Sequence, residues 1–111
     1  MRSLILAAMT CLVPSAWAQA NDLESVTYVC ERRVEVPVIF VNSEGGASYA
    51  IVRIDDRLLG MRQVISASGA RYRSGDGAED YQLWTKGDTA MISVGPDGQD
   101  RTLFGDCRAQ Q

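Results

Sequence analysis

The sequence contains no histidine and only one lysine, Lys86, among its 111 residues. The absence of histidine excludes a Ser-His-Asp triad, a Cys-His pair and a zinc site built on imidazole ligands. No apolar run reaches the roughly 20 residues that a membrane-spanning helix needs, so we expect no membrane insertion. The chain has 11 basic and 14 acidic residues, a net charge of −3, which argues against a nucleic-acid-binding protein and favours a basic partner.

The first 18 residues have the pattern of a secretory signal peptide. Arg2 precedes a short apolar run, and Ala16-Trp17-Ala18 matches the small-residue pattern of signal peptidase. We predict cleavage after Ala18, which leaves one domain over residues 19–111. The alternative is a lipoprotein lipidated at Cys11, but Thr10 fits poorly just before a lipidated cysteine.

Cysteine is scarce, and its placement is informative. Of the three cysteines, Cys11 lies in the signal peptide, which leaves Cys30 and Cys107. An even pair in an exported chain favours a disulfide. The bond would close a loop of 77 residues (107 minus 30), worth about 4 to 5 kcal/mol on the chain-entropy model.

The rest of the chain alternates short apolar-polar segments with turns rich in Gly, Asp and Ser, a pattern that predicts an all-β fold. The pattern does not distinguish a barrel from a sandwich. Residues 19–24 are expected to be a loose leader. Pro37 predicts that Val34–Val41 is an edge strand or is bulged, which leaves open a homodimer paired along it or a guard against such pairing. The expected strands are 26–31, 34–41, 48–54, 57–65, 69–73, 80–85, 89–94 and 101–107.

Ser68 and Lys86 are the residues whose chemistry has to be weighed. They permit a Ser-Lys nucleophilic dyad, which requires a desolvated lysine, a cation and hydroxyl presented to an anionic cleft, or ordinary turn residues. Lys86 precedes Gly87-Asp88 in an expected exposed turn, which argues against the dyad. Acidic groups such as Asp55-Asp56 are interpreted as turn residues, so we expect no metal site and no cofactor.

Two segments carry a resemblance to a known family. Ser66-Ala-Ser-Gly-Ala-Arg-Tyr72 and Trp84-Thr-Lys-Gly87 resemble the two signatures of the bacterial MliC/PliC family of c-type lysozyme inhibitors. The resemblance covers residues 28–107, including the two cysteines. It implies a small antiparallel eight-stranded β-barrel with one disulfide, located in the periplasm of a Gram-negative bacterium. It also implies a non-enzymatic inhibitor whose partner is a c-type lysozyme.

The resemblance further assigns roles to single residues. It implies that Ser68 and Lys86 enter the lysozyme active-site cleft, with Gly69 and Tyr72 as further binding residues. We interpret Trp84 as a support of the barrel. The segment 73–79 looks longer than the family pattern, which would change the rim of the interface. The alternative functions are a small envelope barrel that binds another ligand or structural partner, and a Ser-Lys hydrolase.

Overall fold

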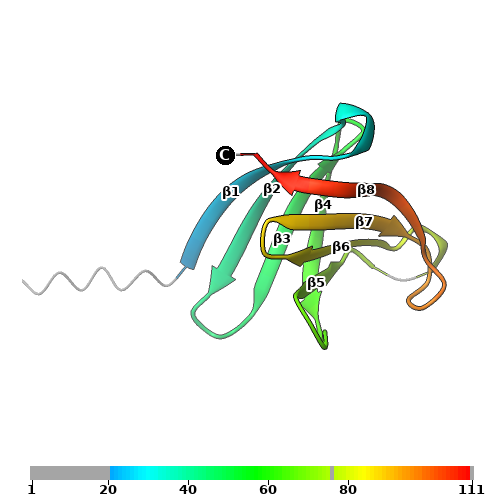
Figure 1. Ribbon diagram of the computed structural model, residues 1–111. Coiled ribbons are helices and arrows are strands. Elements are labelled where there is room, and N and C mark those ends of the chain that lie inside the picture. The colour runs from blue at the N-terminus through cyan, green and yellow to red at the C-terminus, as the bar shows by residue number, and fades with distance from the viewer. Residues whose placement is uncertain (1–20, 76, 111) are drawn as a thin grey trace, which may run out of the picture.

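The computed structural model describes residues 21–75 and 77–110, so the predicted signal peptide and Cys11 lie outside the described residues. Eight strands and two short 3-10 helices follow one another along the chain (Figure 1). The 3-10 helices are η1 (Glu31–Arg33) and η2 (Gly77–Glu79). The strands are β1 (Asn21–Val29), β2 (Glu35–Ser43), β3 (Ser48–Ile54), β4 (Arg57–Val64), β5 (Ala70–Arg73), β6 (Tyr81–Lys86), β7 (Thr89–Val94) and β8 (Arg101–Ala109).

The strands form a closed barrel in which each strand pairs antiparallel with its neighbours in chain order, from β1 to β8. This confirms the all-β fold and the eight-stranded antiparallel barrel that the resemblance implied. Closure is narrow, because β1 and β8 pair only at Tyr28–Ala109 and Val29–Arg108. Residues 21–26 of β1 pair with β2 alone among the described residues, so this part of β1 has one free edge.

Side-chain alternation places the core inside the barrel. In β2 and β3 every second residue is buried, which is the pattern expected of strands with one face on a core. The interior is filled by aliphatic side chains and the three aromatic rings of Tyr28, Phe40 and Tyr72. The largest fully buried side chains are Met61, Leu83, Ile92, Val36, Val38 and Val52.

Two expectations about the first strands were wrong. Residues 21–24 are not a loose leader, because β1 begins at Asn21 and pairs with β2 from there. Val34–Val41 is not an edge strand, because β2 lies between β1 and β3. Pro37 faces Thr27 of β1, whereas the ladder to β3 begins at Val38, so the missing N–H falls where that ladder has not started. A homodimer paired along β2 is therefore excluded, and a homodimer through another surface stays a prediction.

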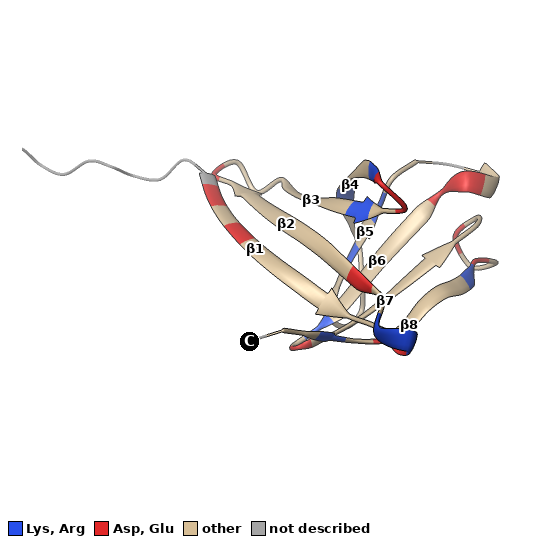
Figure 2. Cartoon of the chain, turned by 90° about the horizontal axis from the view of Figure 1, so that it is seen from above, with Lys and Arg blue, Asp and Glu red and all other residues tan. Residues whose placement is uncertain are grey.

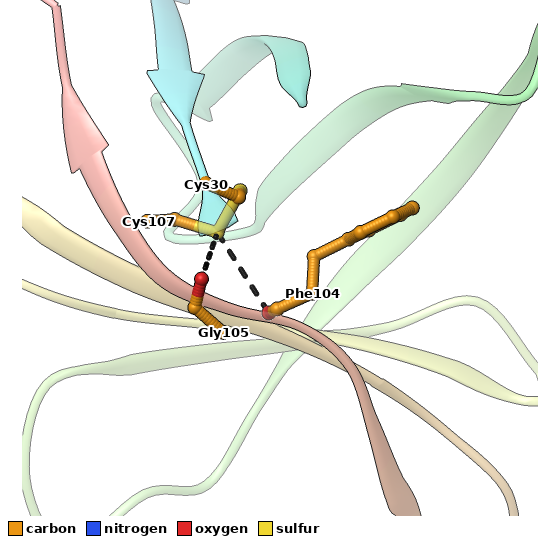
Figure 3. Close-up of a disulfide and its surroundings, with 4 residues drawn as sticks. All are labelled: Cys30, Phe104, Gly105 and Cys107. Atoms are coloured by element: carbon orange, nitrogen blue, oxygen red, sulfur yellow. Dashed lines mark hydrogen bonds between the residues drawn. A yellow bond between two sulfur atoms is a disulfide. The ribbon is translucent and has the colours of Figure 1, made fainter. Parts of the chain in front are cut away.

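The predicted disulfide between Cys30 and Cys107 is present (Figure 3). It lies beside the narrow closure, because Cys30 follows Val29 and Cys107 precedes Arg108, which pair with each other. Cys107 Sγ is 3.7 Å from the carbonyl oxygens of Phe104 and Gly105. A disulfide sulfur has no hydrogen to donate, so these are packing contacts.

The up-and-down order of the strands sorts the connections between two ends of the barrel. The β2–β3 turn, the β4–β5 loop and the β6–β7 turn lie at the end where β1 begins and β8 finishes. The opposite end carries η1, the β3–β4 turn, the β5–β6 loop with η2, and the β7–β8 loop. No helix in the described part of the chain is long and apolar enough to cross a membrane.

Candidate functional site

The topology brings the two segments that carry the family resemblance to one end of the barrel. Ala70 of β5 pairs with Thr85 of β6, so the loop before β5 lies against the end of β6. We call residues 65–69 the Ser68 loop and residues 86–89 the Lys86 hairpin. Positions 68 and 86 therefore lie in adjacent connections, although they are 18 residues apart in the chain (86 minus 68).

Gly69 makes this close approach possible. Its φ is +66°, and a Cβ built on it would lie 2.2 Å from the Thr85 carbonyl oxygen and 2.7 Å from Lys86 Cγ. A backbone oxygen at that distance cannot move aside cheaply, and an L side chain rarely adopts that φ. Only glycine fits at position 69, which explains in physical terms why a glycine follows Ser68.

Trp84 holds the two segments together. Its indole Nε1 donates a 2.9 Å hydrogen bond to the Ser68 carbonyl oxygen, and the Lys86 Nζ lies 4.8 Å from the centre of its ring. The ring is half-buried and shares the outer face of β6 with Gln82. We had expected Trp84 to support the barrel from its core. Instead it lies on the outer face, where it braces the Ser68 loop and the Lys86 hairpin.

The backbones of both segments are fixed while their key side chains remain exposed. The Ser68 carbonyl oxygen also accepts a hydrogen bond from Ser66 Oγ. The Lys86 carbonyl oxygen accepts a 2.9 Å hydrogen bond from Thr89 Oγ1, and Gly87 has a φ of +56° in the turn. The arrangement presents an ammonium and a hydroxyl to solvent on a braced platform, so little conformational freedom would be lost when a partner binds.

Tyr72 has a different position. Its ring is 6% exposed and packs against Phe40 inside the barrel, with ring centres 5.6 Å apart. Burial raises the pKa of its hydroxyl. A buried ring supports β5 behind the Ser68 loop, so the structure makes the Tyr72 ring part of the core and not of the exposed platform.

A buried polar network at the opposite end of the barrel was missed by the sequence analysis. The Arg73 guanidinium donates to Asp80 (2.7 Å), to Gln82 (2.8 Å) and to the Gly95 carbonyl oxygen (2.7 Å). Arg73 and Asp80 are both less than 9% exposed. The only sequence signal is a pair of arginines at alternate positions of one strand, Arg71 and Arg73, which is not distinctive.

The network also explains the segment 73–79 and the acidic β7–β8 loop. Asp97 accepts from Arg71 (2.8 Å) and Arg73 (3.3 Å), while Asp100 accepts from Gln82. These carboxylates tie the β7–β8 loop to β5 and β6 at the end of the barrel opposite the Ser68 loop. Arg71 also donates to the Ile65 carbonyl oxygen (3.1 Å), so the network reaches the start of the Ser68 loop. Within residues 21–75 and 77–110, no group of three or more His, Cys, Asp or Glu side chains could hold a metal ion.

The comparison with protein families settles the family. The model described as membrane-bound lysozyme-inhibitor of c-type lysozyme (MliC) matches residues 28–101, which include the Ser68 loop and the Lys86 hairpin. The chain belongs to the MliC family. Residue Cys107 and the last residues of β8 lie beyond the matched range.

Curated members of the MliC family are similar over the same region. The chain is 40% identical over 72 residues to the membrane-bound lysozyme inhibitor of C-type lysozyme of Pseudomonas aeruginosa, which covers 64% of this chain and 53% of that protein. It is 36% identical over 71 residues to the protein of that description from Cupriavidus necator, again 64% and 53%. The chain thus spans about half the length of the curated relatives it matches.

Two solved structures of such inhibitors have the same architecture. The periplasmic lysozyme inhibitor of C-type lysozyme from Salmonella typhimurium gives a TM-score of 0.71 at 32% identity, over 81% of this chain and 100% of that one. The MliC of Pseudomonas aeruginosa, solved in complex with hen egg white lysozyme, gives 0.62 at 29% identity, over 99% of each chain. The barrel of this chain is therefore the barrel of the family.

Proposed function

We propose that this chain inhibits a c-type lysozyme by placing Lys86 and Ser68 in the active-site cleft of the enzyme. The observation that carries the proposal is the braced pair itself: two exposed polar side chains from separate connections, joined through Gly69 and Trp84. Family membership and the lysozyme complex of the Pseudomonas aeruginosa relative support the choice of partner.

The chemistry of the cleft explains why this pair of side chains would block it. Lysozyme cleaves its substrate with an ionised Asp and a protonated Glu placed on either side of the scissile bond. An ammonium beside the ionised carboxylate replaces the positive charge that develops in the transition state. A hydroxyl can donate to one carboxyl group or accept from the other, and the inserted loop excludes both sugar and water. No step of bond making or breaking is required of the inhibitor.

A Ser-Lys hydrolase is less well supported by the geometry. Such a dyad requires a lysine withdrawn from water so that it can accept a proton. The Lys86 side chain is exposed and its ammonium lies over the outer face of Trp84. Turnover of a chromogenic ester by the purified protein would establish the hydrolase instead.

We propose that the chain acts as a soluble protein of the periplasm after cleavage following Ala18. The disulfide supports an oxidising compartment, and the Salmonella typhimurium relative is described as periplasmic. Mass spectrometry of protein recovered from the periplasm should give an N-terminus at Gln19. An acylated N-terminus at Cys11 would contradict this proposal.

The proposed inhibition is tested by titrating the purified protein against c-type, g-type and i-type lysozymes in a peptidoglycan clearing assay. We expect saturable inhibition of the c-type enzyme with one inhibitor chain per enzyme. Full activity of the c-type enzyme at a large excess of folded protein would overturn the proposal and favour a barrel that binds another ligand.

A further inference from the structure

A hollow lies beside the Lys86 hairpin, between the hairpin and β1. It has a volume of about 280 Å³ and is shared between the free part of β1 and the hairpin. Its floor is aromatic and its rim is acidic. Its lining includes Glu24, Val26, Tyr28, Tyr72 and Asp88.

The hollow forms where β8 does not pair with the first residues of β1. Among the described residues β8 pairs with β1 only at Tyr28 and Val29, and one further hydrogen bond joins Gln110 N–H to the Thr27 carbonyl oxygen (2.8 Å). Within the described part of the chain, nothing pairs with this edge of the preceding residues of β1. Glu24 alternates with Val26 and Tyr28 and therefore shares their inward face. Its register partner on β2 is Phe40, which is buried in the core. The acidic bands near the start of β1 are visible in Figure 2.

Two carboxylates and two phenol hydroxyls around this hollow lack partners among the described residues. Neither Glu24 nor Asp88 forms an ion pair or a side-chain hydrogen bond with the described residues, and no Lys or Arg lines the hollow. Tyr28 is only 3% exposed and Tyr72 only 6%, yet neither hydroxyl has a hydrogen-bond partner within the described part of the chain. Neither hydroxyl oxygen is sealed from solvent, and both tyrosine side chains line the hollow.

The direction of the Tyr28 pKa agrees with the placement of these groups around one hollow. The pKa of the Tyr28 hydroxyl is raised first by burial and then by Glu24, Tyr72 and Asp88. Two unpaired carboxylates beside a buried phenol make a site of negative potential with a low-dielectric floor. Such a site is unfavourable when empty and favourable for a cation.

We propose that this hollow binds an arginine side chain of the partner protein that docks on the Lys86 hairpin. The inference rests on the proposed function, because Thr85 and Gly87 line the hollow and a protein seated on the hairpin would cover it. A guanidinium offers five N–H donors to the carboxylates of Glu24 and Asp88 and to the two hydroxyl oxygens. Its flat face can stack on an aromatic ring, which an ammonium does less well. The net negative charge of the chain matches a basic partner.

The same residues have a purely structural interpretation, which the experiment must separate. An inward-pointing charge on a free strand edge prevents pairing with another chain. On that interpretation, replacing Glu24 would promote self-association and leave binding of the partner unchanged.

The test uses the full mature chain with the isosteric replacements Glu24→Gln and Asp88→Asn, alone and together. Asp55→Asn is the matched control, since it removes one carboxylate charge from the β3–β4 turn at the opposite end of the barrel. We expect each hollow variant to weaken inhibition of c-type lysozyme at least fivefold and the double variant at least 20-fold. The control should change it less than twofold. Inhibition by the double variant at the wild-type level overturns the proposal, whether or not the protein then self-associates.

A second measurement does not depend on lysozyme. N-acetyl-arginine amide is titrated into the free protein, with the ring signals of Tyr28 and Tyr72 followed by NMR, and N-acetyl-citrulline amide serves as the uncharged control. We expect saturable shifts with the arginine compound alone, and their loss in the double variant. If the wild-type protein fails to inhibit lysozyme, the proposed function fails, and this titration still decides whether the hollow binds a guanidinium. Absence of saturable shifts overturns the proposal for the hollow.

Discussion

Replacing Lys86 by alanine removes the only ammonium side chain of the protein from a place where the fold barely depends on it. Lys86 is exposed, and its one contact with a ring is the 4.8 Å approach to Trp84. An exposed cation–π contact is worth about 0.5 to 1 kcal/mol, so the free energy of unfolding should fall by no more than that. In the complex the ammonium would be withdrawn from water beside a carboxylate. Truncating one partner of such a pair costs about 2 to 5 kcal/mol.

At about 1.4 kcal/mol per factor of ten, this loss corresponds to an inhibition constant raised by about 30-fold to a few thousand-fold. The assay is peptidoglycan clearing by a c-type lysozyme at increasing inhibitor concentration, with urea unfolding measured in parallel. Ser68→Ala should lose less, about 1 to 3 kcal/mol, as one hydrogen bond to a charged group. Arg101→Ala at the start of β8 removes an equal charge at the opposite end and should leave inhibition unchanged. A folded Lys86→Ala protein with the wild-type inhibition constant would refute the reasoning and place the contact elsewhere on the barrel.

Four further outcomes are expected. Gly69→Ala should displace the Ser68 loop, because its Cβ would overlap the Thr85 carbonyl oxygen; we expect inhibition weakened at least tenfold and about 1 to 3 kcal/mol of stability lost in urea unfolding. Arg73→Met should cost about 3 to 5 kcal/mol because it strands a buried carboxylate, whereas Arg53→Met at an exposed ion pair should cost less than about 1 kcal/mol. Cys30→Ala should cost about 2 to 5 kcal/mol, with reductant destabilising the wild type by a similar amount in thermal unfolding. The pKa of Tyr28 is raised above its ordinary value of 10.0, so the folded state holds this proton more tightly than the unfolded state does. The stability that this proton contributes is complete below pH 10 and falls as the pH rises further. Tyr28→Phe should therefore reduce the fall in melting temperature at high pH, measured by thermal unfolding at a series of pH values.

The positions of the strands could be predicted because apolar-polar alternation and Gly-Asp turns report directly on a sheet with one buried face. Each of the eight expected segments overlaps one strand of the structure. The start of β1 could not be predicted, because residues 21–25 pair along one edge only and carry little of the apolar pattern that burial demands. Pro37 misled the assignment of β2 to an edge, since the proline rule concerns one N–H and says nothing of whether a neighbouring ladder has begun at that residue.

Some features of the candidate site could be predicted from the sequence, and others could not. The family signatures led us to name Ser68, Gly69 and Lys86, whose role in binding stays a prediction. The approach of Gly69 to the Lys86 hairpin follows from strand order once the barrel is known. The inward position of Tyr72 could not be read from its place beside the Ser68 loop, because it depends on which face of β5 turns to the core. The outward position of Trp84 was missed for the same reason. A large aromatic ring can occupy either the inner or the outer face of a barrel strand, and the register of strand pairing determines which face it takes.

The position of the disulfide has a consequence for how the protein can be made. Two residue pairs join the first and last strands. We expect these to be too few to keep the barrel closed, because joining the first and last strands costs the loop-closure entropy of the chain between them. The Cys30–Cys107 bond lies directly beside these pairs and links the two ends of the sheet covalently. Without the disulfide we expect the barrel to open into a curled sheet with two free edge strands, each able to pair with a strand of a neighbouring copy. Expression in a reducing cytoplasm should therefore yield aggregates, whereas folding after oxidation should yield a dispersed protein from an identical sequence.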